Sequence, residues 1–178
     1  MGGWLKRNAI ALVAVVVLVP ASLFVTFSSD WLSYWSQRAS SPVTVERGAD
    51  VGFGGAEWRV TEVQRIRSTE LPADAGAPPG TDVVVVSVAV SPEGATAPSC
   101  LMDLEETRSG APSRTWSPDT GTGVDLGFDL DVPLYCDSEQ TGDYTLEAVF
   151  VVPADAGDQL RLNVEVVDEL PRYLSLTL

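Results

Sequence analysis

The chain has 178 residues, with 25 acidic and 11 basic side chains, no histidine, and a formal net charge of -14. Its length is enough for one globular domain with a hydrophobic core, plus an appendage. The acidic balance opposes binding to nucleic-acid phosphates, and the lack of histidine removes the commonest general base and transition-metal ligand.

The first predicted element is an apolar transmembrane helix over residues 9–29. Residues 9–27 contain no charged side chain and, at about 1.5 Å per residue, nearly span the roughly 30 Å hydrocarbon core of a bilayer. Lys6 and Arg7 precede this stretch, whereas all 25 acidic residues follow it. By the positive-inside rule, residues 1–8 are expected in the cytoplasm and the remainder outside it. We therefore predict a single-pass signal anchor, flanked by interfacial aromatic residues (Trp4, Trp31, Tyr34 and Trp35).

A cleaved signal peptide is the alternative interpretation of the same segment. Lys6 and Arg7 would form its basic start, and Val19, Pro20 and Ala21 would form a cleavage site of small residues. The apolar stretch is longer than the roughly 7 to 15 residues usual for a signal peptide, which favours a retained anchor. Whether the chain is cut after Ala21 stays open.

The remainder of the chain has the sequence pattern of an all-β domain. Residues 30–50 are mostly polar and are expected to form a juxtamembrane stalk, and residues 51–178 are expected to form the extracytoplasmic domain. Short β-branched runs alternate there with clusters of Gly, Pro, Asp and Ser. About seven strands in about 128 residues predict a β-sandwich, with Trp58 and Phe150 in its core.

The strands are predicted in chain order from alternation and from turn residues. Residues 58–63 alternate, and residues 82–90 are apolar enough to be a central strand. Two further pairings and a last strand are expected: a hairpin of 101–105 with 114–116, a pair of 144–152 with 160–167 across a Pro- and Gly-containing turn, and 173–178.

Cys100 and Cys136 are the only cysteines, and we predict that they form a disulfide bond. Both lie in the part expected outside the cytoplasm, where oxidising conditions allow disulfides to persist. Closing their 36-residue separation stabilises the fold by about 4 kcal/mol on the chain-entropy model. A metal or redox pair would lack the C-x-x-C spacing and a histidine partner.

The strand pattern resembles the immunoglobulin-like β-sandwich domains of small secreted or membrane-anchored bacterial proteins of unknown function. The resemblance covers roughly residues 51–167. It is carried by Gly55-x-x-Trp58-x-Val60-x-x-Val63, Gly80-x-Asp82-Val83-Val84-Val85-Val86-x-Val88-x-Val90, Leu101-x-Asp103-Leu104 with Gly110 and Trp116, Val149-Phe150-Val151-Val152-Pro153, and Leu160-x-Leu162-x-Val164. The chain departs from the pattern at Ser91-Pro92, where such domains often have Asn, and it lacks the Cys-Trp-Cys arrangement of antibody domains. The resemblance implies fold and export, and it implies no catalytic residues.

The most site-like stretch is the acidic segment between Asp119 and Asp137. It combines flexible glycines with carboxylates, which suits calcium in an extracytoplasmic setting, but it lacks the D-x-D-x-D-G pattern of a calcium loop. The alternative to a calcium site is a plain acidic loop held in place by Cys136. The same loop could instead bind a protein partner, with Trp116 as an exposed anchor. The candidate residues are Asp119, Asp125, Asp129, Asp131, Asp137 and Trp116.

Taken together, these patterns predict a membrane-anchored, extracytoplasmic binding module of the cell envelope rather than an enzyme. The exported part contains neither lysine nor histidine, which removes the usual bases for a nucleophilic serine. We expect the membrane and another envelope or membrane protein as partners, and no cofactor, metal or nucleic acid. A ligand- or calcium-binding sensor domain is the alternative function.

Overall fold

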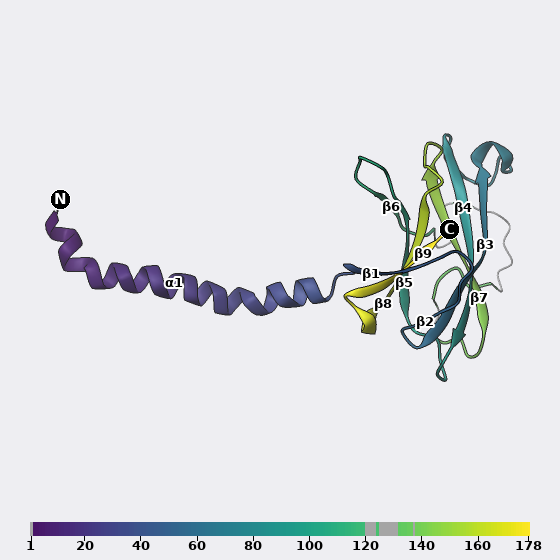
Figure 1. Ribbon diagram of the computed structural model, residues 1–178. Coiled ribbons are helices and arrows are strands. Elements are labelled where there is room, and N and C mark those ends of the chain that lie inside the picture. The colour runs from purple at the N-terminus through teal and green to yellow at the C-terminus, as the bar shows by residue number, and fades with distance from the viewer. Residues whose placement is uncertain (1, 120–123, 125–131, 137) are drawn as a thin grey trace. The chain divides into compact units, whose positions relative to one another are not determined.

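The computed structural model describes residues 2–119, 124, 132–136 and 138–178. The chain divides into two compact units, Met1–Arg38 and Ala39–Leu178 (Figure 1). Four of the aspartates expected in the acidic segment, Asp125, Asp129, Asp131 and Asp137, lie outside the described residues.

The first unit is a single helix, α1 (Gly2–Ser36), rich in Ala, Leu and Val and containing Pro20. Its segment Arg7–Ser36 is long and apolar enough to cross a membrane, and its most apolar part is not buried in the structure. A signal sequence has the same properties, so the structure is compatible with both interpretations. The helix extends beyond the predicted end at residue 29, through an aromatic cluster in which the Trp31 and Trp35 rings lie 5.8 Å apart.

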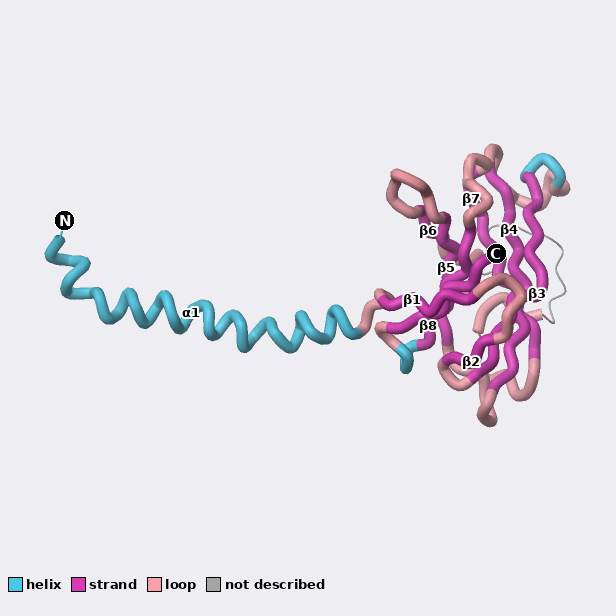
Figure 2. Tube along the Cα trace, in the orientation of Figure 1, coloured by secondary structure: helices cyan, strands magenta, loops and turns pink. Residues whose placement is uncertain are grey.

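The second unit is a β-sandwich of two sheets, with the described strands arranged as Figures 1 and 2 show. The first sheet, sheet A, has the order β1-β9-β8-β5-β6, and sheet B has the order β2-β3-β4-β7. Two short 3-10 helices, Ser68–Glu70 and Val167–Glu169, follow β3 and β8. The strands are β1 (Ser41–Val45), β2 (Val51–Phe53), β3 (Ala56–Arg67), β4 (Thr81–Pro92), β5 (Cys100–Glu106), β6 (Arg114–Trp116), β7 (Tyr144–Pro153), β8 (Leu160–Val166) and β9 (Arg172–Thr177).

The core lies between the two sheets and is filled by alternate residues of their strands. Trp58 and Phe150 from sheet B and Leu104 from sheet A are fully buried in one continuous cluster, which confirms the predicted core positions of Trp58 and Phe150. Burying aliphatic and aromatic side chains of this size contributes about 1.5 to 3 kcal/mol each, so this cluster supplies the main driving force for folding.

Strand β4 is buried on both faces, which explains its nearly continuous run of valines. Val84, Val86, Val88 and Val90 point into the main core, whereas Val83 and Val85 join a second cluster on the outer side of sheet B. Val124 and Leu134, from the connection between β6 and β7, belong to this second cluster. The prediction of a central strand over residues 82–90 is confirmed, because β4 lies between β3 and β7.

Strand β3 keeps its apolar side chains on the inner face by means of a bulge. Val60 pairs with Val88 and Glu62 with Ser87, so the register shifts at Thr61. One extra residue moves every later side chain to the opposite face. The inner positions therefore run from Trp58 and Val60 to Val63, which accounts for the interrupted alternation of the sequence.

The structure differs from the sequence-based expectation at the stalk and in the pairing of two strands. Residues 41–45, expected within the stalk, form β1 and pair in parallel with β9, because Val43 and Val45 pack on the sandwich core. Strands β7 and β8 do not pair with each other: β7 pairs with β4, and β8 pairs with β5 and β9. The turn between β7 and β8 leads from sheet B to sheet A. The apolar faces of the two strands then pack against each other's sheets in the shared core. The β5–β6 hairpin is confirmed.

Candidate functional site

The outer face of sheet A carries a group of acidic side chains, here called the acidic face and defined by Asp103, Glu105 and Glu165. Asp103 and Glu105 point outward from β5 because Met102, Leu104 and Glu106 between and beside them are buried. Glu165 points outward from β8 by the same alternation. The register places Glu165 opposite Leu101, one position along the same face from Asp103. The three carboxylates are each half-buried.

The acidic face holds more negative charge than its own cations balance. Burial raises the pKa of Glu165 above its usual value, and the nearby Asp103 carboxylate raises it further. Burial also raises the pKa of Tyr173 on the neighbouring strand β9, with Glu105 and Glu165 contributing in the same direction and Arg161 opposing them. Arg161 lies opposite Glu105 in the register. These shifts indicate that like charges are held close together on a partly desolvated surface.

Asn163 lies in the centre of this face with one polar atom unpaired. Its side chain is only 8% exposed, and the register places it between Asp103 on β5 and Ser175 on β9. The Asn163 Nδ2 donates a hydrogen bond to Glu105 Oε2 at 2.9 Å. Because a carboxylate only accepts, this bond fixes the orientation of the amide. Asn163 Oδ1 is buried without a hydrogen-bond partner.

Within the acidic segment named by the sequence analysis, Asp119 is the one candidate aspartate that the structure describes. Its Oδ2 accepts a hydrogen bond from the Val124 N–H at 2.9 Å, and its own N–H donates to the Val149 carbonyl at 2.7 Å. The bond to Val149 attaches Asp119 to the edge strand β7, and the bond from Val124 is internal to the segment. Among the described residues, no three Asp, Glu or Cys side chains are arranged to hold a metal ion. The calcium hypothesis stays a prediction.

The same connection pairs with β7 at a second point. The Glu147 N–H donates to the Pro133 carbonyl at 2.9 Å, two residues along β7 from the bond to Val149. An edge strand with free N–H and C=O groups can pair with another chain, and these contacts occupy part of that edge. For its described residues, the connection between β6 and β7 therefore has a structural role on sheet B.

Trp116 lies half-buried on β6 rather than fully exposed. It is opposite Leu104 in the register and packs against the main core. The Arg114 guanidinium carbon lies 5.4 Å from the centre of the Trp116 ring, within the range of a cation–π interaction.

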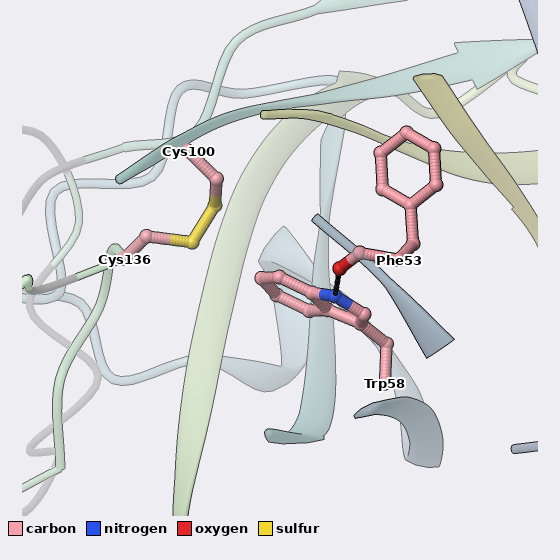
Figure 3. Close-up of a disulfide and its surroundings, with 4 residues drawn as sticks. All are labelled: Phe53, Trp58, Cys100 and Cys136. Carbon is pink, nitrogen blue, oxygen red and sulfur yellow. Dashed lines mark hydrogen bonds between the residues drawn. A yellow bond between two sulfur atoms is a disulfide. The ribbon is translucent and has the colours of Figure 1, made fainter. Parts of the chain in front are cut away.

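The predicted disulfide between Cys100 and Cys136 is confirmed, and it joins the start of β5 to the connection that precedes β7 (Figure 3). Cys100 begins β5 in sheet A, whereas Cys136 follows the segment that pairs with β7 in sheet B. The two Cα atoms are 5.4 Å apart, as is usual for a disulfide. Figure 3 also shows the buried Trp58 indole, whose Nε1–H donates to the Phe53 carbonyl at 2.8 Å.

The acidic face was not predicted from the sequence, because its residues are separated by up to 62 positions in the chain. Outward-facing positions on β5 could be inferred from alternation once the strand was predicted. The pairing of β5 with β8, which brings Asn163 beside Asp103, had no signal in the sequence, because the 160–167 strand was expected to pair with 144–152.

No family model matches the chain, and no curated protein matches it. Three solved structures are similar to it. The yjhA protein of Bacillus subtilis has a TM-score of 0.47 at 12% identity, over 74% of this chain and 98% of that one. An uncharacterised β-sandwich protein of Clostridium difficile 630 has a TM-score of 0.42 at 10% identity, over 79% and 95% of the two chains.

The third similar structure is ycdA of Bacillus subtilis, a candidate lipoprotein, with a TM-score of 0.44 at 17% identity over 72% of this chain. This chain spans 38% of the length of that protein. Identities this low assign no activity to the chain. The fold defines its class as a β-sandwich preceded by one apolar helix.

Proposed function

We propose that this chain is a single-pass protein of the cell envelope whose sandwich binds another envelope or membrane protein outside the cytoplasm. The observation that carries the proposal is the acidic face. Asp103, Glu105 and Glu165 share a partly buried surface, and Asn163 Oδ1 beside them has no hydrogen-bond partner. Unbalanced charge and an unpaired buried acceptor cost free energy in the isolated domain, and a partner that supplies donors would remove that cost.

The anchoring part of the proposal is supported by helix α1. Its apolar segment matches the thickness of a bilayer, Lys6 and Arg7 precede the uncharged stretch, and Trp31 and Trp35 follow it. The disulfide supports an oxidising location for the sandwich. A cytoplasmic N-terminus and an extracytoplasmic sandwich satisfy both features together.

We also propose that the sandwich is of the immunoglobulin-like type. Within sheet A, the four neighbouring strands β9-β8-β5-β6 correspond to the G-F-C-C′ order of those domains, and β1 lies beyond β9. Strands β4 and β7 correspond to B and E in the second sheet. The disulfide lies at a different place from the antibody bridge, since it joins the start of β5 to the connection before β7.

The proposal assigns no chemistry to the domain. After Arg7 the chain contains neither lysine nor histidine, so no serine there has either of these as a general base. The buried carboxylates are in ion pairs: Glu106 with Arg114 and Asp82 with Arg65. A surface for binding fits these residues better than a catalytic centre.

The test is in-cell crosslinking of the tagged full chain, followed by membrane extraction and mass spectrometry. The matched control is a chain that ends at Arg38 and so keeps helix α1 without the sandwich. We expect specific envelope proteins to be recovered with the full chain alone. Equal recovery with both chains, or no enrichment with either, would contradict the proposal. Accessibility of the C-terminus to protease in intact spheroplasts tests the orientation separately.

A further inference from the structure

The unpaired oxygen of Asn163 indicates which kind of chemical group could bind at the acidic face. Asn163 Oδ1 accepts hydrogen bonds and cannot donate them. The carboxylates of Asp103 and Glu165, which the register places on the same face of sheet A, are acceptors as well. A group that satisfies all of them has to donate several hydrogen bonds and carry positive charge. Guanidinium offers five N–H donors and ammonium three, so a basic side chain meets both conditions.

The neighbouring residues leave this site without such a donor from the domain itself. Asn163 Nδ2 donates its hydrogen bond to Glu105 Oε2. Asp103 Oδ1 accepts a hydrogen bond at 3.0 Å from the Ser117 hydroxyl, which is an uncharged donor. Arg161 lies at the Glu105 end of the face, opposite that residue in the register. The part of the face formed by Asp103, Asn163 and Glu165 therefore lacks a cation among its direct cross-strand partners.

The surface beside the carboxylates indicates a protein as the source of the basic group. Leu101, directly opposite Glu165, is 64% exposed, and Val167 just after β8 is 61% exposed. Apolar side chains next to acidic ones complement a segment in which basic and apolar residues alternate. Among the described residues the carboxylates are not arranged to hold a metal ion, whereas a guanidinium spans separated acceptors.

We infer that Asp103, Asn163 and Glu165 form a receiving site for an arginine or lysine side chain of the partner protein, with Leu101 contacting an apolar neighbour of that side chain. This inference rests on the proposed binding function and names the chemistry of its partner. Buried charge-assisted hydrogen bonds of this kind give specificity because the wrong partner leaves the acceptors unpaired.

The test uses the full chain in phosphatidylcholine nanodiscs and a capped peptide in which arginine alternates with valine. The matched peptide has citrulline in place of arginine, which keeps the shape and removes the charge, and spermidine serves as a cation that is not a protein. Calorimetric titration should detect the arginine peptide, with binding of the citrulline peptide and of spermidine weaker by about tenfold or more. Equal binding of spermidine would overturn the assignment to a protein segment.

Three variants separate the site from the net charge of the domain. N163L leaves the charge unchanged and should weaken binding of the arginine peptide by about tenfold, as should E165Q. E57Q removes the same charge as E165Q from an exposed position on sheet B and should leave binding unchanged. Equal affinities for wild type and N163L would overturn the inference. Thermal melting of each variant shows whether it is folded, and E165Q, at a half-buried position, keeps the test decisive if N163L is not folded.

In-cell crosslinking distinguishes failure of this site from failure of the proposed function. If the full chain captures a partner and E165Q captures it equally well, the binding function stands and the receiving site is wrong. If neither captures a partner, the proposed function itself is wrong.

Discussion

The Arg114 Nε donates a hydrogen bond to Glu106 Oε2 at 2.6 Å, at the end of the sandwich where the chain crosses between the sheets. Glu106 Oε1 accepts a second bond from the Gly157 N–H at 2.6 Å. On the opposite sheet, Arg65 binds Asp82 at 2.8 Å and donates to the Ala156 carbonyl at 2.8 Å. One ion pair from each sheet therefore holds the turn between β7 and β8. This arrangement fixes the crossing that the sequence pattern did not predict.

The Glu106 pair predicts an acid-sensitive contribution to stability. The hydrogen bond from Arg114, with that from Gly157, holds the pKa of Glu106 below its ordinary value of 4.5. A lowered folded-state pKa gives stability that is present above the unfolded value and is lost as the pH falls through the folded value. In thermal melts, E106Q should have a lower midpoint at neutral pH and a smaller loss on acidification. The exposed E57Q should follow the wild-type curve, and an E106Q midpoint equal to wild type at neutral pH would contradict the role of the pair.

The β2–β3 turn predicts different costs for two adjacent glycines. Gly54 and Gly55 both have positive φ angles, +60° and +79°, as a two-residue hairpin turn requires. A Cβ at Gly54 would lie 2.8 Å from the Val166 side chain, whereas a Cβ at Gly55 would meet nothing within 4 Å. We expect G55A to cost about 1 to 2 kcal/mol of unfolding free energy, and G54A to cost roughly 1 to 3 kcal/mol more. Equal midpoints in urea for the two variants would rule out the Val166 contact.

Removing the disulfide should destabilise the sandwich substantially. The Cys100–Cys136 bond closes a separation of 36 residues, and the chain-entropy model gives a contribution of about 4 kcal/mol. The double variant C100S/C136S should therefore unfold at a much lower urea concentration than the oxidised protein. Wild type under reducing conditions serves as the comparison, because it loses the same link without a substitution. Unchanged midpoints in both samples would show that the link contributes nothing.

Glu165 predicts a pH dependence of the opposite sign. Burial and then the Asp103 charge raise its pKa above 4.5, so the folded state binds this proton more tightly than the unfolded state. The contribution is therefore present below the unfolded pKa and is lost as the pH rises through the folded one. At neutral pH, E165Q should raise the thermal midpoint slightly, because the change adds at most about 0.5 kcal/mol to the free energy of unfolding at this partly exposed site. At a pH near or below the ordinary pKa of a carboxyl group, the midpoint of E165Q should equal that of wild type. In a chain that already carries D103N, E165Q should raise the thermal midpoint by less than it does in wild type. An equal rise in both backgrounds would exclude coupling between Asp103 and Glu165.

The same residue thus links stability to the inferred function. We expect Glu165 to destabilise the isolated domain and to strengthen binding of a cationic side chain, whereas Glu106 has its hydrogen-bond partners, Arg114 and Gly157, within the domain. If E165Q neither raises stability nor weakens binding of the arginine peptide, Glu165 is an ordinary solvated acid.

The sequence by itself determined the apolar helix, the all-β class, the central strand β4, the β5–β6 hairpin, and the core positions of Trp58 and Phe150. These features depend on local periodicity, on turn residues, and on the size of apolar side chains, all of which are read within a few neighbours. With two cysteines in the chain, the disulfide partner was also determined.

The tertiary structure decided what joins residues distant in the chain. Alternation in residues 160–167 predicts a strand with one apolar face, but it does not say which of several strands will pair with it. Packing of two sheets around Trp58 places β8 beside β5 rather than β7, and only then does Asn163 lie beside Asp103. The acidic face exists because non-local pairing, rather than local sequence, sets which outward side chains share a surface.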